Sequence, residues 1–267
     1  MSRSQEGGKL SEVAKMKGDR ASEVKESVRK RVWEEMERQN IARFPRPVFG
    51  RIPNFVGAET AARRLAALPE FGEARVVKVN PDSPQRPVRE LVLSLGKVLL
   101  MPTPRLRGGF VVLESGRLPS NSLRRASTIR GALQYGVPVG LGELPEVDLL
   151  VMGSVAVSRR GARVGKGGGY GEIEFAILQE LGLVRDGTPI ATTVHEVQIV
   201  EGIPLEEHDV PVDIIVTPKR VIESMTPYPR PRGLLWNKIG EDAVGRMPIL
   251  RELRGRTKNQ RRMLDPS

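Results

Sequence analysis

The sequence predicts an α/β fold in which a mostly parallel sheet is covered by helices on both faces. Apolar runs such as VDLLVMGSVAVS at 147–158 alternate along the chain with helix-forming segments. Strands of a parallel sheet are buried on both faces and therefore read as uninterrupted apolar runs. The chain has 267 residues, of which 39% are hydrophobic and 28% charged, which is enough for one large or two small domains.

The first helix is expected at 22–40, after a loose polar lead at 1–20. Its apolar residues recur every four positions and so lie on one helix face: Val24, Val28, Val32 and Met36. The stretch 43–55 contains three prolines and is expected to be an extended connector.

Helices and strands then alternate. Further helices are expected at 57–68, 88–96, 122–136 and 172–182, the last of which ends at a capping glycine. Strands are expected at 74–80, 97–103, 109–114, 147–158, 189–200 and 213–223. This order supports the mostly parallel sheet.

The composition excludes several kinds of functional site. The chain has no cysteine, which rules out disulfides, thiolate zinc sites and cysteine nucleophiles. It has only two histidines, His195 and His208, which leaves little material for a histidine metal site or a serine–histidine triad. Any bound metal is therefore expected to be a hard cation held by carboxylates, such as magnesium.

The net charge of +11 is concentrated at the carboxyl end. Residues 226–267 hold ten Lys/Arg against four Asp/Glu, a balance of +6, whereas residues 1–40 hold ten against eight, a balance of +2. Two interpretations remain open: contact with RNA through the basic tail, or a solvated and partly disordered end. The sequence shows neither a long apolar run nor a secretory signal, so a soluble cytoplasmic protein is expected.

The stretch RVGKGGGYGEIEFAIL at 163–178 places a cluster of glycines just before a predicted helix. Free backbone N–H groups and the helix dipole make such a junction an anion site. The loop is not a Walker loop, because only three residues separate Gly161 from Gly165, and it lacks the dinucleotide fingerprint, because Tyr170 stands where a glycine is required. It predicts a phosphate-binding loop with Lys166 as a point charge; the alternative is a flexible turn.

Two acidic and two basic residues are candidates to take part in this anion site. Glu172 falls in the first turn of the helix and Asp213 opens a strand, so each is either a magnesium ligand or a capping or turn residue. Lys25 and Arg29 are four residues apart and share one helix face. A shared anionic ligand would explain that pairing; the alternative is an exposed basic face.

Several motifs together resemble the 5-formyltetrahydrofolate cyclo-ligase family, also called methenyltetrahydrofolate synthetase. They are VDLLVMGSVAVSRRGARVGKGGGYGE, IATTVHEVQIVEGIPLEEHDVPVDIIVTP and the Lys-x-x-x-Arg element KESVR. The chain is more similar still to the subgroup called methenyltetrahydrofolate synthetase domain-containing proteins, through FPRP, RIPNF, LLMPTPRLRGG and EEHDVPVD. The resemblance covers roughly residues 30 to 240.

The resemblance implies a three-layer α/β/α sandwich with a mostly parallel sheet. It divides the chain into a flexible basic lead at 1–20, a cyclo-ligase-like domain at 21–240 and a basic tail at 241–267. It implies a ligase of one-carbon metabolism that uses ATP and Mg²⁺ to convert 5-formyltetrahydrofolate, or a related formylated pterin, to 5,10-methenyltetrahydrofolate, releasing ADP and phosphate.

The resemblance also implies roles for individual residues. ATP would be bound by basic side chains and by the loop: Lys25, Arg29, Arg163, Gly165, Lys166, Gly167, Gly168, Gly169 and Tyr170. Three of these would be catalytic: Arg163, Lys166 and Tyr170. The folate would contact Tyr170 and Glu59, and magnesium would bind to Glu172 and Asp213.

The chain departs from the family pattern at two places. The family's Tyr-Tyr-Asp reads Tyr-Gly-Glu here, with Gly171 in place of an aromatic residue, and Met-Pro-Gly reads Met-Gly-Ser at 152–154. Both departures leave the phosphate-binding half of the motif intact. They keep open an alternative function, a non-catalytic homologue that binds nucleotide or RNA through its basic ends.

Overall fold

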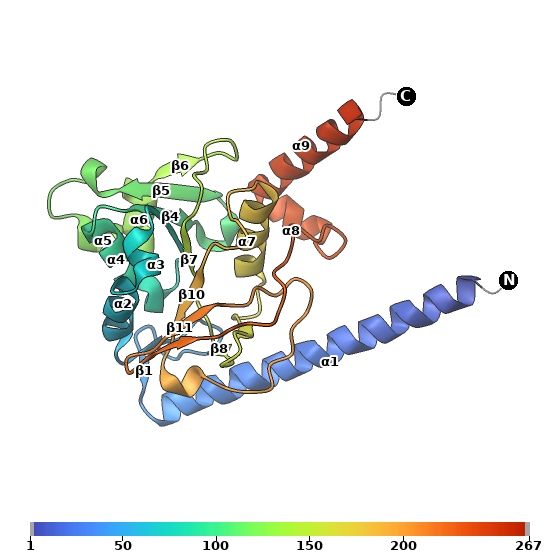
Figure 1. Cartoon of the computed structure of the whole chain (residues 1–267), viewed down its shortest axis with the longest axis horizontal. Coiled ribbons are helices and arrows are strands. Elements are labelled where there is room, and N and C mark those ends of the chain that lie inside the picture. The colour runs from blue at the N-terminus through green and yellow to red at the C-terminus, as the bar shows by residue number, and fades with distance from the viewer. Residues whose placement is uncertain (1–2, 265–267) are drawn as a thin grey trace.

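The computed structural model describes the backbone of residues 3–264 and the side chains of residues 18–256. Its centre is an eight-stranded sheet in the order β12-β11-β10-β7-β3-β4-β5-β6 (Figure 1). The strands are β3 (Val76–Val79), β4 (Val98–Pro102), β5 (Phe110–Glu114), β6 (Val137–Val139), β7 (Leu149–Val151), β10 (Ile190–Thr193), β11 (Ile214–Val216) and β12 (Val221–Glu223).

The middle of this sheet is parallel and its edges are antiparallel. Strands β4, β3, β7, β10 and β11 pair in parallel, whereas β5, β6 and β12 join with antiparallel pairing. The prediction of a mostly parallel sheet is confirmed. All five parallel strands end at the same edge, which brings the loops that follow them together.

Helices cover both faces of the sheet and give three layers. One face packs against α2 (Ala58–Ala66), α3 (Pro69–Glu73), α4 (Arg86–Ser94), α5 (Leu123–Ala126) and α6 (Ile129–Tyr135). The second half of α1 (Arg3–Arg38) belongs to the same hydrophobic cluster and contacts the turn at Glu196–Gln198. The other face packs against α7 (Tyr170–Glu180), α8 (Glu241–Arg246) and α9 (Pro248–Leu264). Alternate strand residues point to opposite faces, as with Leu99 and Leu100 of β4, which fall in different hydrophobic clusters. The predicted three-layer α/β/α sandwich is confirmed.

The first helix begins earlier than the sequence indicated. Helix α1 starts at Arg3 rather than near Ser22, so most of the stretch predicted as a loose lead is helical, and this end lies away from the sheet in Figure 1. The predicted apolar stripe packs through Val28, Val32 and Met36, which are buried. The proline-rich connector after it is closed by a small antiparallel pair, β1 (Ala42–Arg43) with β2 (Asn54–Phe55).

Four predicted elements are divided in the structure. The strand expected at 189–200 ends with β10 at Thr193 and is followed by a 3-10 turn at Glu196–Gln198. The helix expected at 122–136 is two helices, α5 and α6, because Thr128 caps the second and accepts a hydrogen bond from the N–H of Gly131. The strand expected at 147–158 ends at Val151, and a separate hairpin follows, β8 (Ala156–Val157) with β9 (Arg163–Val164). The strand expected at 213–223 is the antiparallel pair of β11 and β12. Short 3-10 turns occur at Ser83–Gln85, Pro104–Leu106, Ser115–Arg117 and Glu196–Gln198.

The carboxyl-terminal segment packs on the body rather than forming a free tail. Helices α8 and α9 occupy the stretch expected as a basic tail, and Val244, Leu250 and Ile249 are buried in the cluster that contains α7. The sequence did not reveal the apolar pattern of these residues, because arginines separate them along the chain. Among the described residues, no helix combines the length and apolar character that crossing a bilayer requires.

An ion pair between Lys78 and Glu174 joins the centre of the sheet to α7. Lys78 lies on β3 between Leu100 and Leu150 of the neighbouring strands and is fully buried. Its Nζ donates to Oε2 of Glu174 at 2.5 Å, and Nδ2 of Asn80 donates to the same oxygen at 2.6 Å. Burial raises the pKa of Glu174, and the Lys78 ammonium opposes that shift. The pair fixes the first turns of α7 over the carboxyl ends of β3 and β7.

Because the pair is buried, removing one partner is expected to cost far more than removing both. We expect Glu174→Leu to lower the free energy of unfolding by about 3–5 kcal/mol, since it leaves the Lys78 charge without its counter-ion. The double variant Lys78→Met/Glu174→Leu serves as the control and is expected to recover at least half of that loss. Denaturant unfolding of the three proteins measures this, and equal losses in the single and double variants would contradict the account.

Candidate functional site

The candidate site lies where the carboxyl ends of β3 and β7 meet the amino terminus of α7. A cavity of about 550 Å³ opens there, lined by α1, by the loops after β3 and β7 and by the glycine loop at 165–169. In open α/β sheets, ligands bind in such a crevice outside the carboxyl ends of the strands. We call this the cradle cavity.

Glycine is required in the loop for two reasons. Gly167 and Gly169 have φ angles of +99° and +65°, in the left-handed region that side chains disfavour. A Cβ on Gly168 would lie 2.9 Å from the ring of Tyr170. Gly169 then serves as the N-cap of α7, and the first N–H groups of a helix have no partner within it. The backbone thus presents donors and a helix dipole toward the cavity, as an anion site requires.

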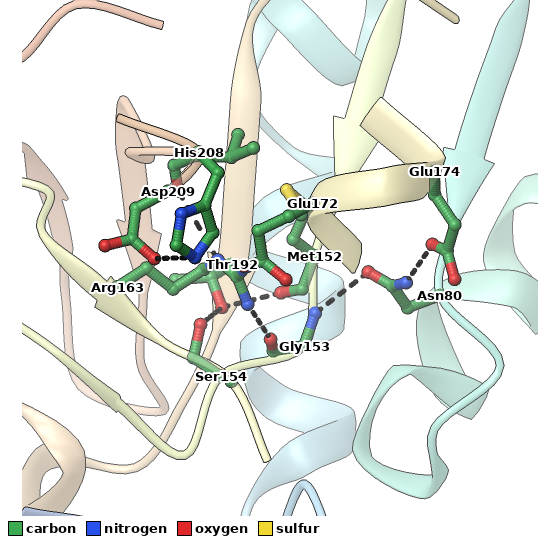
Figure 2. A network of polar contacts seen from close by, with 12 residues as sticks. Asn80, Met152, Gly153, Ser154, Arg163, Glu172, Glu174, Thr192, His208 and Asp209 are labelled. Atoms are coloured by element: carbon green, nitrogen blue, oxygen red, sulfur yellow. Dashed lines mark hydrogen bonds and ion pairs between the residues drawn. The ribbon is translucent and has the colours of Figure 1, made fainter. Parts of the chain in front are cut away.

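Four basic side chains surround the loop. Arg163 is buried and donates to the carbonyl of Gly153 at 2.8 Å and to Glu172. Figure 2 shows its guanidinium beside these two residues. Arg29 donates from Nε to the carbonyl of Gly165 at 2.8 Å, which ties α1 to the loop.

The two lysines of the cavity are held by carboxylates. Lys25 is buried and bonds to Glu206 at 2.8 Å and to Asp209 at 2.5 Å. Lys166 bonds to Asp82 at 2.7 Å, with its own side chain 41% exposed. Arg163 and both lysines are therefore paired with carboxylates, and a phosphate that entered the cavity would compete with those carboxylates for these cations.

A buried arginine fixes the loop that carries Asp82. Arg89 of α4 donates to the carbonyl oxygens of Asn80, Asp82 and Ser127. Burial lowers the pKa of Arg89 to about 9, an effect to which Arg86 adds and which Asp82 opposes. The guanidinium is still charged at neutral pH and holds the loop in place.

A chain of hydrogen bonds continues from this loop to the strand beside it. Oδ1 of Asn80 accepts from the N–H of Gly153 at 3.2 Å, and Nδ2 of Asn80 donates to Glu174 (Figure 2). Gly153 leaves little room for a side chain, since a Cβ there would lie 3.0 Å from Ile52 and from Gln85. The loops after β3 and β7 are thereby fixed relative to α7.

Most of the residues singled out in the sequence are brought together. Those that line the cradle cavity are Lys25, Arg29, Arg163, Gly165, Lys166, Gly167, Gly168, Gly169, Tyr170 and Glu172. Gly171, where the family has an aromatic residue, also lines it, and a Cβ there would lie 3.2 Å from Met152. The sequence signal that grouped these residues was the loop spacing together with the Lys-x-x-x-Arg element.

Two of the predicted site residues lie elsewhere. Asp213 precedes β11 at the amino-terminal edge of the sheet, where its Oδ2 accepts from Ile190 N–H at 2.8 Å and pairs with Arg230 at 2.5 Å. It lines a different cavity, so the pairing of Asp213 with Glu172 in one metal site is wrong. Glu59 is exposed in the first turn of α2 and does not line the cradle cavity. Neither residue belonged to a sequence motif specific enough to predict its position in the fold.

Sequence reasoning missed several polar residues of the site. Asn80 and Asp82 follow an apolar strand in KVNPDSP, and a polar run at the end of a parallel strand could have revealed them. Glu206 and Asp209 are the carboxylates that EEHDVPVD contributes to the cavity, and Asp209 lies four residues before the aspartate that was chosen. Glu174 was missed because a glutamate in a helix ordinarily lies on its exposed face.

The carboxylates of the cavity fit magnesium only together with a phosphate ligand. Among the described residues, no group of three or more acidic, histidine or cysteine side chains is close enough to hold a metal ion. Glu172 and Asp209 both line the cavity, however. Magnesium is usually held by one or two carboxylates together with waters and substrate phosphates, so this donor set fits the ion when a polyphosphate is present.

The chain resembles known proteins at the level of sequence. It is 48% identical over 240 residues to the methenyltetrahydrofolate synthase domain-containing protein of Bos taurus, an alignment that covers 88% of this chain and 63% of that protein. It therefore spans less than two thirds of that relative. The 5-formyltetrahydrofolate cyclo-ligase of Escherichia coli K12 is 34% identical over 80 residues, which cover 30% of this chain and 41% of that enzyme.

A solved structure and a family model were also compared with the chain. The NMR structure of 5,10-methenyltetrahydrofolate synthetase from Aquifex aeolicus aligns with a TM-score of 0.49 and 20% identity, covering 77% of this chain and 95% of that one. The sequence model of the 5-formyltetrahydrofolate cyclo-ligase family matches residues 21–218. That match covers most of the chain and includes the glycine loop. The chain belongs to the 5-formyltetrahydrofolate cyclo-ligase family.

Proposed function

We propose that this chain is an ATP- and Mg²⁺-dependent ligase that closes 5-formyltetrahydrofolate, or a related formylated pterin, to the 5,10-methenyl form with release of ADP and phosphate. One observation carries the proposal: the glycine loop, the amino terminus of α7 and four basic side chains face a single cavity. The family membership of the chain supports the choice of reaction.

In this proposal the phosphates of ATP lie on the backbone of Gly167 to Gly169. Lys166 is the most exposed of the four cations and contributes a mobile charge, whereas Arg163 is buried and fixed by the Gly153 carbonyl. Lys25 and Arg29 come from α1, so that helix provides one wall of the site. Electrostatic stabilisation and positioning are the main tasks of a protein in phosphoryl transfer.

Glu172 and Asp209 are the residues proposed to hold magnesium. Each is bonded to a cation in this structure, Glu172 to Arg163 and Asp209 to Lys25. A polyphosphate that takes over these cations would leave the carboxylates free for the ion. When bound, magnesium would neutralise charge on the phosphates.

The chemical step proposed is attack of the formyl oxygen on the γ-phosphorus of ATP. ADP leaves, and the second folate nitrogen then displaces the phosphate from the activated formyl carbon and closes the ring. The residues of this chain orient the γ-phosphate through Arg163 and Lys166 and stabilise its charge. Tyr170 lies at the first position of α7, over Gly168, where it is proposed to separate nucleotide from folate.

The proposed reaction is tested directly by turnover. Purified protein with ATP, Mg²⁺ and 5-formyltetrahydrofolate is expected to show growth of methenyl absorbance together with release of one phosphate per methenyl group. Omission of Mg²⁺ or ATP is the control and should abolish both signals. ATP binding without absorbance growth or phosphate release would refute the ligase acting on 5-formyltetrahydrofolate.

The role of Lys166 is tested by nucleotide affinity. Lys166→Ala is expected to weaken ATP binding about tenfold to a hundredfold, because a charge-assisted phosphate contact contributes roughly 1.5–3 kcal/mol. Lys30→Ala, on the exposed face of α1, removes an equal charge outside the cavity and should leave the affinity unchanged. Calorimetric titration measures both, and equal affinities for Lys166→Ala and the wild type would remove Lys166 from the site.

A second candidate function, RNA binding, is favoured by the charge of the carboxyl end. Ten Lys/Arg against four Asp/Glu lie in residues 226–267. Deleting 241–267 would be a poor test, because Val244 and Leu250 belong to the core. The double variant Arg246→Glu/Arg251→Glu instead changes only exposed residues.

If the carboxyl end binds single-stranded RNA, this double variant should weaken binding and flatten its salt dependence. Loss of two phosphate contacts predicts a change of about 1.4 in the slope of log affinity against log salt. Arg63→Glu, exposed on α2, is the control for charge alone. Wild-type protein that does not bind RNA, or a variant with the wild-type slope, would refute this function.

A further inference from the structure

A second cavity adjoins the glycine loop. It encloses about 310 Å³ and shares Gly167, Gly168, Gly169 and Glu172 with the cradle cavity. The remaining lining comes from α7, from His208 and from residues 231–243, which lead into α8 and form part of it. Figure 1 shows α8 beside α7. We call this the apolar pocket.

The apolar pocket differs in character from the cradle cavity. Its side chains are aliphatic on two opposed elements: Ile173 and Ala176 from α7, and Leu234, Leu235, Ile239 and Ala243 from the carboxyl-terminal segment. Lys238 and His208 are the basic residues that line it. Aliphatic walls with few polar groups suit a flat ring rather than a charged group.

The carboxyl-terminal wall of this pocket lies outside the part of the chain that matches the family model. That match ends at residue 218, whereas the wall begins at 231. The segment is nevertheless held against α7: Gly233 lies close to Glu180, and the N–H of Leu234 donates to Oε2 of Glu180 at 3.0 Å. The wall is therefore built by residues that the matched region does not contain.

We propose that the apolar pocket binds the purine base of the nucleotide whose phosphates lie on the glycine loop. This inference rests on the proposed function, because it takes the ligand of the loop to be ATP. A ligand with phosphates on Gly167 to Gly169 can enter the pocket without leaving the loop, since the same three glycines line both spaces.

The size of the pocket favours a base over a folate. Its volume of about 310 Å³ is at the lower end of small-molecule sites. That space suits one bicyclic ring with its sugar, whereas a reduced folate has a bicyclic ring, an aryl ring and a glutamate in series. The larger cradle cavity, with about 550 Å³, remains for the formylated ring.

The test compares ATP with inorganic triphosphate, which has the phosphates but no base. Ala243→Phe fills the pocket from α8, and Leu235→Asn replaces an apolar wall by a polar group of similar size. Both are expected to weaken ATP binding at least fivefold and to leave inorganic triphosphate binding within twofold of wild type. Gly245→Phe adds the same ring on the same helix at an exposed position with open space around it, and should change neither.

Each outcome of the titrations decides the inference. If both pocket variants bind ATP as the wild type does, the base lies elsewhere and the inference is wrong while the phosphate site stands. If the variants instead lose affinity for 5-formyltetrahydrofolate and keep that for ATP, the pocket holds the pterin and the inference is again wrong. Wild-type protein that binds neither ATP nor inorganic triphosphate would overturn the proposed function and the inference together.

Discussion

The site depends on the buried contact between Lys78 and Glu174. A lysine in the middle of an apolar sheet face needs a counter-ion, because an unpaired charge there would cost several kcal/mol. Glu174 of α7 supplies that counter-ion, and the contact fixes the position of α7 over β3. Asn80, bonded to the same carboxylate and to Gly153, extends the constraint to β7. The glycine loop immediately precedes α7, so its position follows from this contact.

The pairing of cations with carboxylates explains how a densely charged cavity is stabilised. Arg163 and Lys25 are almost fully buried and are paired with Glu172 and Asp209, whereas Lys166 pairs with Asp82 near the surface. In the proposed function, phosphate binding would exchange one anion for another and keep the buried cations paired throughout. The same exchange would release carboxylates beside the phosphates, where the proposed magnesium ion would bind.

The sequence was informative where a local pattern determines the structure. The alternation of apolar strands and helices predicted the layers, and the glycine run predicted a loop at the amino terminus of a helix, now α7. It failed where the local signal was weak: a single threonine cap, Thr128, separates α5 from α6, and α9 packs through apolar residues that are separated by arginines. Asp213 and Asp209 are equally plausible in EEHDVPVD, and only the direction of β11 shows that Asp209 reaches the cavity.

The central claim is that the phosphates of a nucleotide lie at the amino terminus of α7. The most direct measurement is a crystal structure with Mg²⁺ and a non-hydrolysable ATP analogue. The account predicts phosphate oxygens within hydrogen-bond distance of the backbone N–H groups of the Gly167–Gly169 loop, with Lys166 turned from Asp82 toward them. Phosphates bound at the opposite edge of the sheet, near Asp213 and Arg230, with Lys166 still on Asp82, would contradict it.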